Sequence, residues 1–346
     1  MNIEIRKFDI NSISDEIWNK FFDLSEAILT EIDPHEPLAP REMRKEFIRS
    51  RYEDPNLKNY RYLVFDKDNN ETLVGYGRIE VESDKSPTYR IKYHIGQTDL
   101  LVDKNYRRKG VGTRLIKHIA VEMSSFEPSV SELEISTSLD GAKSFLEKLG
   151  GKFNTESTEY RLYLDVVDWK LMKNWVKDIK KKAKDVEIEV LTSISDDDLN
   201  EYCKVYSEIL NHGINIDTEE QMLITPDKVK LSEATIKKNA MNWITLLARE
   251  KDKAISGFTE ILVHPKTGHR IVQMLTGVAT KYRGRGIGKA LKAEMLLYIQ
   301  KNFPSAKYLS SSFRNPDENI IEINKKIGFK KHRTVRLFKL ELSKLL

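Results

Sequence analysis

Two short stretches of the chain combine arginine and glycine in a pattern that suits anion binding. They are Tyr106-Arg107-Arg108-Lys109-Gly110-Val111-Gly112 and Tyr282-Arg283-Gly284-Arg285-Gly286-Ile287-Gly288. A turn that opens a helix leaves its first N–H groups without partners inside the helix, and the helix dipole adds positive charge there. Because glycine has no Cβ, a diphosphate can approach those N–H groups closely. The shared Arg-x-x-Gly-x-Gly pattern therefore indicates a phosphate-bearing ligand at each loop.

The surrounding residues predict the elements that hold these loops. Strand-like apolar residues precede each loop, and an apolar stripe with helical spacing follows it, over 115–123 and 291–299. Arg107 and Arg283 are 176 residues apart, so the chain carries two copies of one unit. Neither loop fits the Walker A or the Rossmann glycine pattern. A glycine-rich turn without a ligand is the alternative, and its repetition in the same context argues against it.

The composition excludes several classes of protein. The 346 residues contain one cysteine, so neither a disulfide framework nor a thiolate-rich metal site is expected, and we predict no metal. No apolar run reaches the roughly 18 residues that a membrane span needs. The first ten residues are typical of a strand rather than of a signal peptide. We therefore expect a cytoplasmic protein without a membrane partner.

The two loops resemble the acetyl-CoA-binding motif of the GNAT family of N-acetyltransferases. The segment from Asn315 to Asn319, followed by Ile323 to Phe329, is also similar to that family. The resemblance covers essentially the whole chain as two tandem copies, and within the family it points to the tandem group that includes mycothiol synthase. It implies an α/β fold with a mixed sheet flanked by helices in each copy. It also implies acetyl-CoA as co-substrate between two splayed parallel strands, near 272–280 and 307–313.

The same resemblance implies which residues bind acetyl-CoA. In the second copy, which matches the motif more fully, they are Val278, Thr280, Arg283, Gly284, Arg285, Gly286, Ile287, Gly288, Lys289, Asn315 and Asn319. In the first copy they are Val102, Arg107, Arg108, Lys109, Gly110, Val111, Gly112 and Thr113. A backbone N–H near 276–278 would face the thioester oxygen.

The positions that carry catalysis in the family are altered in this chain. The tyrosine that often protonates the leaving thiolate is replaced by Leu146 in the first copy and by Asn324 in the second, and only Asn324 can donate a hydrogen bond. The usual glutamate base is replaced by Gly96 and Val272. We take Glu260, on the preceding strand, as the candidate base. A solvated strand carboxylate is the alternative for Glu260.

The repeat predicts a first domain over 1–168, a linker helix over 169–184 and a second domain over 185–346. The linker carries seven lysines and one aspartate. We expect a helix that packs on one domain, and the alternative is a lysine-rich face that docks an anionic partner. The first domain has a net charge of -6 and the second of +5. This difference favours a monomer in which the domains pair as a pseudo-dimer, with a homodimer as the alternative. No nucleic-acid-binding motif is present.

Taken together, these features predict an N-acetyltransferase that moves acetyl from acetyl-CoA directly to an amino group. The acceptor is expected to be a small molecule or a peptide, and the second domain is the better candidate for the chemistry. A non-catalytic acyl-CoA-binding or regulatory tandem is the alternative, because the usual tyrosine and glutamate are missing.

Overall fold

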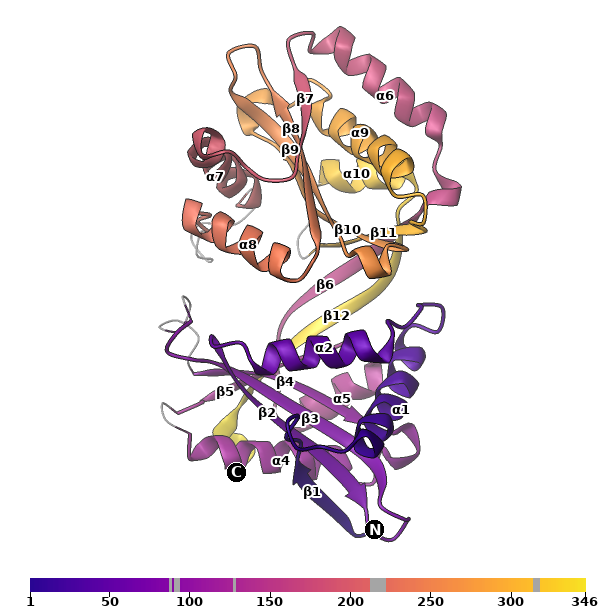
Figure 1. Cartoon of the computed structure of the whole chain (residues 1–346), viewed down its shortest axis with the longest axis vertical. Helices are drawn as coiled ribbons and strands as arrows, with labels where there is room; N and C mark the ends of the chain where they lie inside the picture. The colour runs from indigo at the N-terminus through magenta and orange to yellow at the C-terminus, as the bar shows by residue number, and fades with distance from the viewer. Residues whose placement is uncertain (87–88, 90–93, 127–128, 212–221, 314–317) are drawn as a thin grey trace. The chain divides into compact units, whose positions relative to one another are not determined.

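A computed structural model describes the chain except residues 87–88, 90–93, 127–128, 212–221 and 314–317. The chain packs as two compact units (Figure 1). Unit 1 consists of Met1–Glu156 with Thr334–Leu346, and unit 2 consists of Ser157–Arg333. Among the helices described, none combines the length and the apolar character that crossing a bilayer requires.

Unit 1 is a mixed sheet with helices on both faces. Its strands lie in the order β1 (Ile3–Lys7), β2 (Leu57–Asp66), β3 (Thr72–Glu82), β4 (Ile95–Val102), β5 (Glu132–Thr137) and β12 (Lys330–Glu341). Its helices are α1 (Asp15–Ile32), α2 (Arg41–Tyr52), α4 (Val111–Ser124) and α5 (Asp140–Lys148). Alternate residues of β2 face two cores, because side chains of a strand point to opposite faces of the sheet. Tyr62 and Val64 share a core with α4, whereas Leu63 and Phe65 share one with α1.

Unit 2 repeats this architecture. Its strands lie in the order β6 (Lys152–Tyr163), β11 (Tyr308–Phe313), β10 (Arg270–Val278), β9 (Ile255–Val263), β8 (Asn242–Arg249) and β7 (Glu187–Leu191). Its helices are α6 (Trp169–Lys182), α7 (Asp196–Leu210), α8 (Pro226–Lys238), α9 (Ile287–Asn302) and α10 (Glu318–Ile327). In Figure 1, α7 and α8 cover one face of the sheet, and α6, α9 and α10 cover the other. Two cores fill these layers, one around α9 and one around α7.

The repeat predicted from the sequence is confirmed by matching elements. Among the described residues, each unit contains one parallel strand pair, which joins Ile95–Thr98 to Glu132–Ile135 in unit 1 and Arg270–Val272 to Tyr308–Ser310 in unit 2. The first strand of each pair, β4 or β10, continues into an arginine–glycine loop. The helix α4 or α9 begins directly after that loop. The mixed α/β fold class with two tandem copies is therefore confirmed.

The last strand of each copy packs in the unit formed by the other copy. The end of β6 pairs with β11 of unit 2 through Tyr308↔Tyr163, and the end of β12 pairs with β5 of unit 1 through Arg336↔Thr137. The two packing units therefore differ from the expected boundaries at 168 and 185. The physical reason is that both strands are 12 residues long whereas β5 and β11 have six. Each long strand carries its apolar end into the other copy's core, as Leu162 does in unit 2.

The predicted linker segment forms α6, a helix that covers part of unit 2. The side chain of Asp168 caps its first turn by accepting a hydrogen bond from the N–H of Leu171 at 2.9 Å. Met172 and Ile179 are buried in the same core as α9, and the lysines lie mostly toward solvent. The apolar stripe of this segment therefore packs within unit 2.

Candidate active site

The two arginine–glycine loops have the same backbone shape. Gly284 and Gly286 have φ angles of 80° and 86°, and the matching residues Arg108 and Gly110 have 62° and 86°. A left-handed conformation costs an L residue roughly 1–2 kcal/mol. A Cβ built on Gly110, Gly284 or Gly286 would meet no atom within 4 Å. The turn thus favours glycine through its backbone conformation, and the space beside each of these glycines is open.

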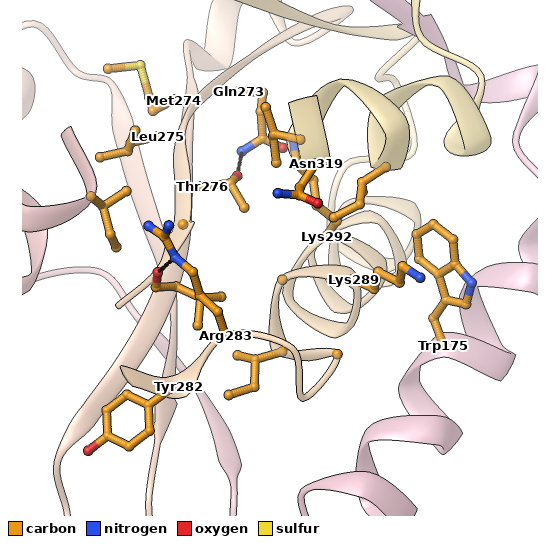
Figure 2. A pocket seen from close by; sticks show the side chains of 18 of the residues that line it. Trp175, Gln273, Met274, Leu275, Thr276, Tyr282, Arg283, Lys289, Lys292 and Asn319 are labelled. Carbon is orange, nitrogen blue, oxygen red and sulfur yellow. Dashed lines mark hydrogen bonds between the residues drawn. The ribbon is translucent and has the colours of Figure 1, made fainter. Parts of the chain in front are cut away.

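In both copies the motif arginine ties the loop to the end of the preceding strand. The Nε of Arg283 donates to the carbonyl oxygen of Val278 at 3.0 Å, and the Nε of Arg107 donates to that of Val102 at 3.1 Å. This contact fixes the arginine at the end of the strand, four residues before the helix begins. The unpaired N–H groups and the dipole of a helix start attract an anion. Figure 2 shows Arg283 in this position at the edge of a cavity.

The cavity has a volume of about 960 Å³ and belongs to unit 2. It begins at the loop 282–288 and is also lined by residues of α6, α7, α9, α10, β10 and β11 (Figure 2). Its size lies within the range of roughly 300–1,000 Å³ that small-molecule and cofactor sites occupy. The cavity therefore joins an anion-binding loop to a space large enough for an extended ligand.

The inner part of the cavity lies where two parallel strands diverge. The ladder between β10 and β11 ends at Val272↔Ser310, while β10 continues to Val278 and β11 to Phe313. A bulge in β10 separates the pairs Gln273↔Ile261 and Thr276↔Thr259. It leaves Met274 and Leu275 outside the ladder with β9, and both residues line the cavity.

Gln273 holds this bulge in place. Its Nε2 donates to the carbonyl oxygen of Glu260 at 2.7 Å and to the hydroxyl of Thr259 at 3.1 Å. The hydroxyls of Thr259 and Thr276 are 2.7 Å apart. These bonds satisfy buried polar groups next to the gap between the strands, so they fix the backbone that faces a ligand.

Most residues that the family resemblance implies for the second copy come together at this cavity. Those that line it are Val278, Arg283, Gly284, Arg285, Gly286, Ile287, Gly288, Lys289 and Asn319. Thr280 does not line it, and its N–H donates to the carboxylate of Glu208 at 2.6 Å. That bond lowers the pKa of Glu208. Asn315 lies outside the described residues.

Glu260, the candidate base, is fully buried behind the cavity. It is 0% exposed and does not line the cavity, so the interpretation as a solvated strand carboxylate is wrong. The hydroxyl of Tyr202 donates to its Oε1, and that of Thr245 donates to the same atom at 3.2 Å. Burial raises the pKa of Glu260 to about 7. The ring of Tyr202 contacts that of Tyr206, which does line the cavity.

Asn324 is also buried rather than exposed to the cavity. It lies on α10 and is 5% exposed, and its Oδ1 has no hydrogen-bond partner among the described residues. Ile320 and Ile323 of the same helix line the cavity instead. The predicted roles of Glu260 and Asn324 would thus both require an intermediary or a movement.

A lysine that the sequence interpretation missed lines the inner cavity. Lys292, on α9, is 2% exposed, and its amine lies 5.4 Å from the ring centre of Phe329. Burial lowers the pKa of Lys292 to about 7. The repeat contains the signal that could have found it, since the matching residue of α4 is Ile116, a core residue that is 0% exposed.

The sequence interpretation also missed the contribution of α6. Trp175, Asp178, Ile179 and Lys182 line the cavity. The amine of Lys289 lies 5.8 Å from the ring centre of Trp175. In the sequence, Trp175 belongs to an apolar stripe, and nothing in that pattern predicts that it also lines a cavity.

Residues 18–151 match the model of the acetyltransferase (GNAT) family. The chain contains a GNAT-family domain. The fold of the whole chain is similar to a tandem GNAT protein from the clavulanic acid biosynthesis pathway, solved without acetyl-CoA. The TM-score is 0.71 at 17% identity, and 99% of each chain is covered. No protein with a curated description matches the sequence.

Two further solved structures have the same fold. A GCN5-related N-acetyltransferase from Sphaerobacter thermophilus has a TM-score of 0.63 at 17% identity, with 98% of this chain and 96% of the other covered. A GNAT-family acetyltransferase from Colwellia psychrerythraea has a TM-score of 0.52 at 13% identity, with 98% and 100% covered. The chain therefore has a tandem GNAT fold along nearly its whole length.

The two copies differ in the residues around their loops. Both terminal nitrogens of Arg107 donate to Glu31 in unit 1. A Cβ on Gly112 would lie 3.3 Å from the ring of Phe145, whereas one on Gly288 would have its nearest neighbour at 3.6 Å. The other first-copy positions implied for acetyl-CoA, namely Val102, Arg108, Lys109, Gly110, Val111 and Thr113, also lie in unit 1 and outside the cavity.

Proposed function

We propose that the chain is an acyl-CoA-dependent N-acyltransferase whose second GNAT copy binds the coenzyme and carries out the transfer, with acetyl as the simplest acyl group. The observation that carries this proposal is the cavity of unit 2, which runs from the loop before α9 into the gap between β10 and β11. The loop suits the phosphates of the coenzyme. The gap suits its uncharged arm and the thioester.

The reaction makes three demands on such a site. The amine must reach the thioester as the free base, the carbonyl oxygen must meet hydrogen-bond donors as charge develops on it, and the thiolate must gain a proton. The backbone at the bulge, at Met274 and Leu275, is the candidate for the oxygen because it lies outside the ladder with β9 and lines the cavity.

Glu260 remains our candidate base, acting through a neighbour. Its pKa of about 7 suits proton exchange near neutral pH. Tyr202 donates to Glu260 and contacts the ring of Tyr206, which lines the cavity. Asn324 remains the candidate hydrogen-bond donor toward the coenzyme sulfur. The acceptor we propose is the amino group of a small molecule or peptide. For the chain itself we propose a cytoplasmic monomer or homodimer that binds no nucleic acid, which light scattering and gel-shift measurements would check.

A second function, acyl-CoA binding without turnover, is favoured by one observation. Neither Glu260 nor Asn324 lines the cavity. A tandem that binds the coenzyme and regulates another process would need the loop and the gap alone. The two functions differ in one measurable property, which is release of free coenzyme A thiol.

Calorimetric titration of acetyl-CoA tests the binding site. The double variant Arg283→Ala with Gly286→Glu is expected to weaken binding at least about tenfold, since hydrogen bonds to charged groups contribute roughly 1.5–3 kcal/mol each. The matched variant Arg107→Ala with Gly110→Glu, in unit 1, is expected to leave the affinity unchanged. Binding that survives both double variants would contradict the assignment of the loops.

Thiol release in the presence of a panel of amines then separates the two functions. An acyltransferase is expected to release thiol with at least one amine, and the release should stop in the unit 2 loop variant. Tight binding without thiol release across a panel of small amines and peptides would instead support the regulatory module.

A further inference from the structure

The amine of Lys292 lines the cavity beyond the loop. A coenzyme whose phosphates bind at the loop would place only uncharged groups there. Gly286, the N-cap of α9, lies at the loop, and Lys292 lies six residues further along the helix. At about 1.5 Å per residue this places its Cα roughly 9 Å beyond the loop. The parts of an acyl-CoA that extend past the phosphates are the pantetheine arm and the thioester, which are uncharged. An amine at this depth meets an anion only if another part of the substrate supplies one.

The surroundings of Lys292 leave its charge uncompensated. It has neither an ion pair nor a hydrogen bond within the part of the chain that the structure describes, and its amine lies 5.4 Å from the ring centre of Phe329. The other charged residues that line the cavity are Asp178, Lys182, Arg270, Arg283, Arg285 and Lys289. Five of these six are cations, so the lining formed by the described residues favours an anionic ligand.

Nothing in the fold requires a lysine at this position. The matching helix of unit 1 carries Ile116 there, fully buried in its core. Burying an amine without an anion is unfavourable, whereas isoleucine fills the same helix position with apolar surface. The lysine is therefore explained by a ligand better than by packing.

We propose that the second copy takes an acyl-CoA whose acyl group ends in a carboxylate, and that Lys292 pairs with that carboxylate. The proposal rests on the proposed acyl-CoA site. Because Lys292 is 2% exposed, its partner has to be carried into the cavity. A coenzyme anchored at the loop before the same helix delivers its acyl end in this way. Asn319, which lines the cavity and is labelled near Lys292 in Figure 2, brings an amide group to the same part of the cavity.

The test compares two donors of equal acyl length by calorimetry, succinyl-CoA and butyryl-CoA. The full-length chain is expected to bind succinyl-CoA about ten- to a hundredfold more tightly, as one charge-assisted hydrogen bond would give. Lys292→Met and Lys292→Ile are expected to abolish this preference. Ile116 shows that the fold accepts isoleucine at this helix position, so the second variant guards against misfolding.

Lys289→Met provides the matched control. It removes an amine from the same helix and the same cavity, but an exposed one. It is expected to weaken both donors alike and to leave their ratio unchanged. Equal affinity of the wild-type chain for both donors, or a preference that survives in Lys292→Met, would overturn the proposal while leaving the acyl-CoA site intact. Failure of every acyl-CoA to bind the wild-type chain would overturn both.

Proton uptake gives a second readout of the same pair. At pH 8, succinyl-CoA is expected to bind with uptake of up to one proton, because the carboxylate favours the charged amine; butyryl-CoA is not expected to do so. The comparison of binding enthalpies in buffers of different ionisation enthalpy measures it. Uptake that persists in Lys292→Met would overturn the assignment to Lys292. If Lys292→Met instead weakens only acceptors that carry a carboxylate, the charge belongs to the acceptor and the proposal is wrong.

Discussion

Both terminal nitrogens of Arg107 donate to the carboxylate of Glu31, Nη1 to Oε1 and Nη2 to Oε2, each at 2.6 Å. This bidentate pair lowers the pKa of Glu31 and occupies the arginine that would otherwise attract a phosphate. In the second copy the matching Arg283 lines the cavity. The pair thus neutralises the arginine of the first loop within unit 1.

Glu31→Gln is expected to give unit 1 some affinity for coenzyme A, because it removes the negative charge that neutralises Arg107. Calorimetry should then detect a second binding event, at least about tenfold weaker than the first. The control is Glu16→Gln, which removes an exposed carboxylate of the same helix that pairs with Lys20. A titration that stays at one equivalent would indicate that Phe145, rather than Glu31, closes the first loop.

Gly286→Ala and Gly110→Ala separate backbone strain from ligand binding. Both glycines have a φ of 86° and no neighbour that a Cβ would touch. Each variant is expected to lower the free energy of unfolding of its unit by about 1–2 kcal/mol. Only Gly286→Ala should also weaken acyl-CoA binding. Chemical denaturation and calorimetry check the two parts, and equal weakening by both variants would contradict a coenzyme site in the second copy.

Phe338→Ala and Leu162→Ala test the exchange of the last strands. Phe338 belongs to the second copy by sequence but is fully buried in the core of unit 1, and Leu162 belongs to the first copy but is fully buried in the core of unit 2. Such truncations cost about 2–5 kcal/mol. Hydrogen exchange should show lost protection over 1–156 for Phe338→Ala and over 157–333 for Leu162→Ala. The opposite pattern would mean that each strand packs in its own copy.

Glu260→Gln should change how stability depends on pH. Burial raises the pKa of Glu260 from 4.5 to about 7 in the folded chain. Between these values the folded state holds the proton more tightly than the unfolded state, so the free energy of unfolding falls as pH rises from about 4.5 to 7. The variant is expected to be more stable than wild type at pH 8, on the order of 3 kcal/mol, and equal to it near pH 4.

Tyr202→Phe provides the matched control for this prediction. The Tyr202 hydroxyl donates to Glu260 and lowers its pKa, so its removal should extend the fall in stability to higher pH. Denaturant titrations from pH 4 to 8 measure both effects. A difference between wild type and Glu260→Gln that does not change with pH would show that Glu260 does not titrate in this range.

The loops and the helices that follow them could be predicted because their signals are local. A left-handed glycine before an apolar stripe specifies a turn and a helix start within about ten residues, as at Gly286 and α9. Val278 and Arg283, which the sequence predicts at one site, line the same cavity because they are close together on one strand and its loop. Repetition of the whole pattern was enough to predict the tandem fold.

Other features depend on residues that are far apart in the chain. A solvated carboxylate is one interpretation of Glu260 from the sequence, whereas in the structure Tyr202 of α7 and Thr245 of β8 donate to this buried carboxylate. Trp175 reaches the cavity because α6 folds back onto unit 2. The spacing of residues within either segment does not predict these contacts.

By itself, the sequence determined the two copies, their loops and the order of their elements, because each is set by interactions between residues close along the chain. Only the tertiary structure decided that β6 and β12 exchange units, that Glu31 occupies Arg107, and that Lys292 is buried in the cavity of unit 2. The physical reason is that strand pairing, ion pairing and burial are settled by which distant segments meet, and two similar copies offer each segment more than one suitable partner.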